Sequence, residues 1–114
     1  MSDKVISIAG ELSDELSKTE CCARFCHYKQ IVGADPILYN RIKDFKKAQI
    51  EFEYRELQDS PLSFEEEKNV SKLYSELVLN DNARHYLESE KAVLELFSRI
   101  IDIVSAACKI DIEL

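Results

Sequence analysis

The stretch at residues 80–108, NDNARHYLESEKAVLELFSRIIDIVSAAC, decides the fold. Apolar residues recur in it at alternating spacings of four and three, with Glu90 as a polar exception. This pattern is a heptad stripe, typical of a long helix whose neighbours lie on one side. About 28 residues would span roughly 42 Å, so the rest of the chain is expected to cover the stripe. Its members are Ala83, Leu87, Glu90, Leu94, Phe97, Ile101, Val104 and Cys108.

Length and composition predict a single folded domain. The chain has 114 residues, of which 46% are hydrophobic and 32% charged, enough apolar side chain to offset the entropy of ordering. Glycine and proline occur only twice each, which disfavours the tight turns of sheets and glycine-rich phosphate loops. We expect one helical domain over residues 1–108, followed by a tail at 109–114 that extends the helix or frays.

Local start signals predict four further helices before the long one. Residues 3–18 repeat apolar side chains at helical spacing, and a second helix follows Thr19 and stops at Gly33. Asp35-Pro36 predicts the start of a third helix. Ser63 followed by Glu66 forms the capping-box pattern of a fourth helix. The predicted fold class is all-α: an antiparallel bundle of about five helices with a long C-terminal helix, which we expect to be dimeric.

The third helix carries two apolar lines. One line is expected to face the core and contains Leu38, Ile42, Phe45, Gln49 and Phe52. The second line contains Ile50, Tyr54 and Leu57 and is offset from the first. Because a chain this short has little surface with which to cover both, the second line is a candidate for self-association.

Charge is distributed unevenly along the chain. The formal net charge is −7, yet residues 21–50 contain six basic and two acidic residues, a local balance of +4 against −11 in the remainder. Within this basic segment, the candidates for binding a protein partner are Arg41, Lys43, Lys46 and Lys47. The alternative is that these side chains coat a solvent-facing helix surface. Direct RNA binding through the three lysines ranks lowest, because the chain as a whole repels polyanions.

Three cysteines crowd into a short segment. Cys21, Cys22 and Cys26 precede His27, and a fourth thiol, Cys108, lies near the C-terminus. With acids at Asp3, Glu11, Asp14 and Glu15 the first residues do not form a signal peptide, and no apolar run is long enough to cross a bilayer. We therefore expect a cytoplasmic protein with reduced, packed thiols and no cofactor. The alternative is a metal or iron–sulfur redox sensor that uses Cys22, Cys26 and Cys108.

The order of these features resembles the YlbF/YmcA (Com_YlbF) family of small bacterial helical proteins over residues 5–107. The resemblance rests on the opening Ala9-x-x-Leu12, on Leu16-x-x-Thr19, on the start of the third helix at Asp35, on Phe45-Lys-Lys-Ala-Gln49 and on Tyr86-Leu87-x-x-Glu90 with Leu94. It implies an all-helical, dimer-forming protein without enzymatic activity. Better-known members act in competence, development and biofilm formation through a complex that steers messenger-RNA processing.

Complex-forming members of that family carry a cysteine-bearing C-terminal extension linked to an iron–sulfur cluster. This chain resembles the short branch without that extension, since only Cys108 lies near its end. We therefore expect a non-enzymatic regulatory module that binds proteins, with paralogous family members among the possible partners and no membrane or nucleic-acid contact.

Overall fold

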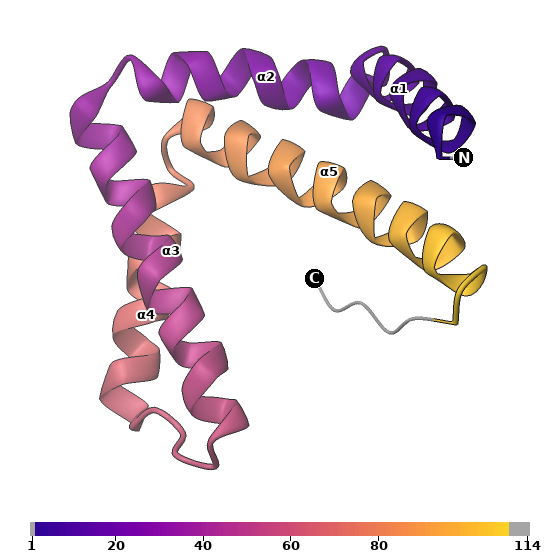
Figure 1. Cartoon of the computed structure of the whole chain (residues 1–114). Coiled ribbons are helices and arrows are strands. Elements are labelled where there is room, and N and C mark those ends of the chain that lie inside the picture. Colours follow the sequence, from indigo (N-terminus) through magenta and orange to yellow (C-terminus); the bar gives the residue numbers. More distant parts are fainter. Residues whose placement is uncertain (1, 110–114) are drawn as a thin grey trace. The chain divides into compact units, whose positions relative to one another are not determined.

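The computed structural model describes residues 2–109, which contain five α-helices and no β-strand (Figure 1). The predicted tail lies, apart from Lys109, outside the described residues. None of the described helices is both long and apolar enough to cross a membrane. The prediction of five helices is confirmed. Their bounds are α1 Asp3–Ser17, α2 Glu20–Gly33, α3 Pro36–Leu57, α4 Phe64–Leu77 and α5 Asp81–Ala106.

The helix starts follow from side chains that satisfy orphan backbone N–H groups. Asp35 Oδ1 accepts a hydrogen bond of 3.2 Å from the N–H of Leu38, and Pro36 occupies the first turn of α3. Ser63 and Glu66 form a reciprocal capping box at 3.2 Å in each direction. Each predicted start is confirmed within a residue or two.

The chain divides into two compact units. One unit contains the residues up to His27 together with those from Leu87 onward, and the other contains residues 28–86. Helices α2 and α5 each contribute to both units. The expectation of a single domain ending at residue 108 stays a prediction.

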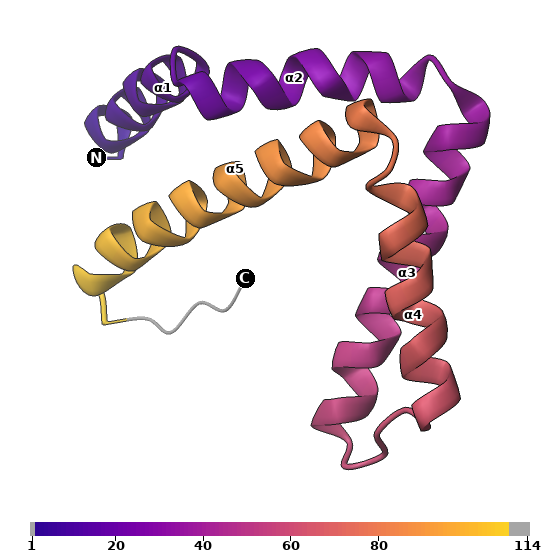
Figure 2. The same ribbon diagram turned by 180° about the vertical axis from the view of Figure 1, so that it is seen from behind.

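The unit of residues 28–86 is built on a helical hairpin. Helices α3 and α4 lie side by side in both views (Figures 1 and 2) and run antiparallel because a short loop joins them. Phe45 packs against Tyr74 across the hairpin, with ring centroids 5.4 Å apart. The buried residues of this unit are Val32, Leu38, Ile42, Phe45, Leu77 and Ala83.

In the unit that contains the greater part of α5, the buried residues of this helix are not those of the predicted heptad stripe. The buried residues of α5 here are Ser89 and Val93, and the half-buried Leu96 continues their line. Phe97, expected in the core, is 42% exposed. The helix carries two adjacent apolar lines, and its inward face is one residue away from the stripe that the spacing favoured. Leu94 and Val104 of that stripe are also exposed, whereas Leu87 and Ile101 are half-buried.

Helix α1 forms where the periodicity predicts it, but its apolar face is open. Val5, Ile8 and Leu12 are exposed, and Leu16 is half-buried. Within residues 2–109, apolar surface therefore remains uncovered on α1 as well as on α5.

Candidate interaction surface on helix α3

Helix α3 has a buried face and an exposed apolar face. Leu38, Ile42 and Phe45 are buried. Ile50, Tyr54 and Leu57 are 66%, 61% and 84% exposed. The offset of the second apolar line from the first is thus confirmed, while its role in self-association stays a prediction. Exposed apolar groups gathered on one helix face are typical of an interaction site.

Two lysines extend the exposed face toward the start of the helix. Lys43, Lys47, Ile50, Tyr54 and Leu57 are spaced by four, three, four and three residues, so they share one side of α3. Lys43 Nζ lies 5.6 Å from the centre of the Tyr39 ring, which is itself half exposed. We refer to these residues together as the outer face of α3: Tyr39, Lys43, Lys47, Ile50, Tyr54 and Leu57.

The four basic residues predicted to bind a partner do not form one surface. Lys46 is half-buried, and its Nζ lies 3.3 Å from the Tyr86 hydroxyl and 4.9 Å from the centre of that ring. Arg41 is two positions from Lys43, which places it about 200° around the helix. Only Lys43 and Lys47 therefore lie on the outer face.

Helix α3 is divided into a basic and an acidic half. Residues 36–50 contain four basic side chains and one acid, whereas residues 51–57 contain three acids and Arg55. Lys43 and Lys47 are like charges four residues apart, an arrangement that slightly destabilises a helix. Among the side chains of residues 2–109, neither of these lysines forms an ion pair, and neither does Glu51, which borders the outer face beside Lys47. These three charges are thus available to a partner.

The loop that ends the hairpin is held by hydrogen bonds around Arg55. Its side chain donates to the carbonyl oxygens of Ser60 at 3.0 Å and Pro61 at 3.4 Å, and to Glu66 Oε2 at 2.7 Å. The backbone N–H of Ser60 donates to the Arg55 carbonyl and that of Asp59 to the Glu56 carbonyl. With Asp59 at φ 54°, this is a Schellman ending. The end of α3 is therefore well fixed.

Glu66 has a lowered pKa in the folded chain. Hydrogen bonds from the backbone and side chain of Ser63 hold the pKa of Glu66 below its ordinary value of 4.5, and Arg55 lowers this pKa further. These donors stabilise the ionised carboxylate. The effect belongs to the capping box and does not indicate a catalytic acid.

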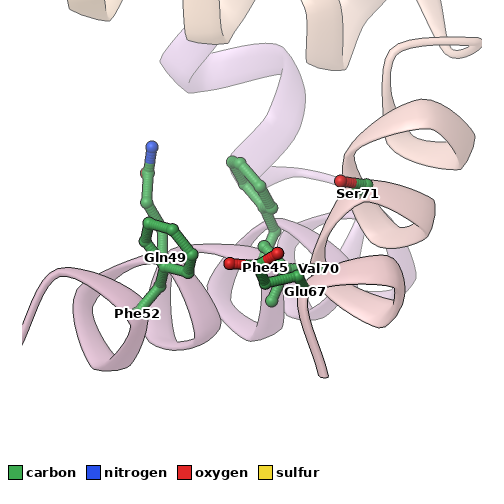
Figure 3. A pocket seen from close by; sticks show the side chains of 6 residues that line it. All are labelled: Phe45, Gln49, Phe52, Glu67, Val70 and Ser71. Carbon is green, nitrogen blue, oxygen red and sulfur yellow. The ribbon is translucent and has the colours of Figure 1, made fainter. Parts of the chain in front are cut away.

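A small hollow lies between α3 and α4 (Figure 3). Its lining is partly aromatic and partly polar, and its volume is about 250 Å³. Ligand pockets usually occupy ~300–1,000 Å³, so we assign this hollow to imperfect packing of the hairpin. Its lining residues are Phe45, Gln49, Phe52, Glu67, Val70 and Ser71.

The cysteines differ from the expectation of packed thiols. Cys21 and Cys22 are half-buried, whereas Cys26 and Cys108 are exposed. The expectation was wrong for the latter two, because the buried side of α2 runs through Phe25 rather than through position 26. Within residues 2–109, no three His, Cys, Asp or Glu side chains are grouped to hold a metal ion. Cys22, Cys26 and Cys108 are thus not assembled into a site.

Sequence reasoning missed one aromatic contact. The ring of Tyr28 in α2 stacks on His85 in α5, with centroids 5.0 Å apart and an interplanar angle of 24°. Both side chains are half-buried. They are 57 positions apart in the chain, so no local pattern signals the pair.

The structure defines an all-helical protein whose candidate site is a helix face rather than a cleft. A family model described as "Control of competence regulator ComK, YlbF/YmcA" matches residues 5–109. The chain belongs to this YlbF/YmcA family. The family is described by the control of a regulator, not by an enzymatic reaction.

Relatives with similar sequences carry the name UPF0342 protein. One from Caldicellulosiruptor saccharolyticus is 30% identical over 103 residues, covering 90% of this chain and 86% of its own length. One from Caldicellulosiruptor bescii is 28% identical over 110 residues, covering 96% and 92%. One from Desulfitobacterium hafniense is 27% identical over 103 residues, covering 90% and 83%. No solved structure gives a significant match to the chain.

Proposed function

We propose that the protein is a cytoplasmic, non-enzymatic regulatory module that self-associates and binds another protein. The outer face of α3 carries this proposal. It presents three large apolar side chains, each more than half exposed, on a helix whose end is fixed by the Arg55 network. Burying apolar surface is the main driving force of protein association.

Family membership supports the regulatory part of the proposal. The family is described by its control of the competence regulator ComK, which is a regulatory role. The exposed apolar residues of α1 and α5 offer additional surface for a protein partner, with Val5, Ile8, Leu94 and Val104 as examples. Paralogous YlbF/YmcA proteins of the same organism are the partners we would test first.

Sedimentation equilibrium over a range of micromolar concentrations tests this proposal. Self-association predicts a mass that rises with concentration from the 13.2 kDa of one chain toward twice that value. Each paralogue is then added to the protein at a fixed ratio, and a mixed complex is expected with at least one. A mass that stays at 13.2 kDa throughout, with and without the paralogues, would contradict the proposal.

A further inference from the structure

We infer that the outer face of α3 binds the same face of a second copy in antiparallel orientation, so that the basic half of each helix lies against the acidic half of the other. This inference rests on the proposed self-association and specifies its geometry. The contact is isologous, as is usual for homodimers with a twofold axis.

Charge decides the orientation. In an antiparallel pair the equivalent edges of the two helices meet, and Lys47 shares an edge with Glu51, four residues further on. With the twofold axis near Gln49, each Lys47 lies opposite Glu51 of the second copy. A parallel pair would instead place lysines opposite lysines and glutamates opposite glutamates. Such juxtaposition of like charges disfavours a complex.

The residues of the outer face have the spacing that a helical partner requires. Positions 43, 47, 50, 54 and 57 alternate by four and three, which is the repeat of two helices packed along a common seam. From position 39 to position 57 the seam is about 27 Å long. Ile50 then lies next to the twofold axis and close to Ile50 of the second copy, so the centre of the contact is apolar.

The two ends of the seam are also complementary. Tyr54 and Leu57 of one copy lie over Lys43 and Tyr39 of the other. A lysine stem offers apolar surface while its ammonium group attracts an aromatic face. Within one chain, Lys43 already lies over an aromatic ring, that of Tyr39. Tyr54 and Leu57 lie beside Arg55, whose hydrogen bonds hold the end of α3 to the loop and to α4.

A charge-swap series measured by sedimentation equilibrium tests the inference. The first variant, Lys47→Glu, places acids of the two copies against one another, because position 47 lies opposite Glu51 in the antiparallel pair. The second adds Glu51→Lys and so restores complementarity with the polarity reversed. The matched control, Lys68→Glu, changes the net charge equally on α4, where this lysine is exposed. Circular dichroism confirms that each variant is helical.

The antiparallel geometry predicts that the first variant raises the dimer dissociation constant at least about tenfold. The second variant is expected to return this constant to within about threefold of the wild-type value, with the control unchanged. A wild-type dimer that the first variant does not weaken, or that the second does not restore, would overturn the antiparallel contact and leave the outer face to a different partner. A wild-type chain that is monomeric would overturn the proposed self-association itself.

Discussion

Arg55 Nη1 lies 2.7 Å from Oε2 of Glu66, an ion pair that joins the end of α3 to the first turn of α4. Both residues have a second role beside this contact. Arg55 also holds the loop carbonyls of Ser60 and Pro61, and Glu66 also completes the capping box with Ser63. The pair therefore couples the ending of one helix to the start of the next.

This coupling predicts a dependence of stability on pH. The pKa of Glu66 is lower in the folded chain than its ordinary value of 4.5. Its contribution to stability is therefore fully present above that ordinary value and is lost as the pH falls through the lowered folded pKa. In urea denaturation, the advantage of wild type over Glu66→Gln should shrink as the pH is lowered from about 6 to about 3. An advantage that stays constant over this range would contradict the assignment.

The left-handed residue in the hairpin loop predicts a stabilising substitution. Asp59 has φ 54° at the position where helices often end in glycine. In this conformation a residue with a Cβ atom is disfavoured by about 1–2 kcal/mol. Glycine avoids this penalty, but it is more flexible in the unfolded chain, which cancels part of the gain in stability. We expect Asp59→Gly to raise the free energy of unfolding by about 0.5–1 kcal/mol. Asp59→Ala, the control, should give no gain, and equal effects of the two variants would argue against this backbone conformation.

The exposure of Leu77 and Phe97 predicts different losses of stability when each side chain is truncated to alanine. Leu77 is 1% exposed, whereas Phe97 is 42% exposed. Leu77→Ala is expected to lower the free energy of unfolding by about 2–5 kcal/mol. Phe97→Ala should cost less than about 2 kcal/mol, because much of its ring is already in water. If urea denaturation showed a larger loss of stability for Phe97→Ala than for Leu77→Ala, Phe97 would be a core residue after all.

The exposure of the thiols predicts their order of reaction. Cys26 and Cys108 are exposed, and Cys21 and Cys22 are half-buried. Under native, reducing conditions, mass spectrometry after brief alkylation with iodoacetamide should find the label first at Cys26 and Cys108, because access limits the other two. Zinc added beforehand is expected to leave this order unchanged. Protection of Cys22, Cys26 and Cys108 together by zinc would show that the three thiols do assemble a site.

Helix positions were predictable because their signals are local. Asp35 before Pro36, and Ser63 three residues before Glu66, each satisfy backbone groups within one turn. Such contacts need no knowledge of the rest of the chain. The Schellman ending at Asp59 was not foreseen, because the residue is not glycine.

The inward face of α5 was not predictable in the same way. Residues 87–104 carry two neighbouring apolar lines, and periodicity alone favoured the line through Leu94 and Phe97 over the line through Ser89 and Val93. Choosing between them requires the positions of other helices. The stacking of Tyr28 on His85 depends on the same distant information. On α3, by contrast, Leu38, Ile42 and Phe45 are buried as predicted. Gln49, predicted on the same line, is exposed, and Phe52 is half-buried, so the buried face is confirmed only in the first part of the helix.

The most direct measurement of the central claim is the mass in solution of an Ile50→Lys/Tyr54→Lys variant beside wild type. Both residues are exposed, so the variant should keep the wild-type circular dichroism spectrum. We expect sedimentation equilibrium to give a concentration-dependent approach to a dimer for wild type and the 13.2 kDa of a single chain for the variant. A folded variant that associates as strongly as wild type would show that the outer face of α3 is not the surface of self-association.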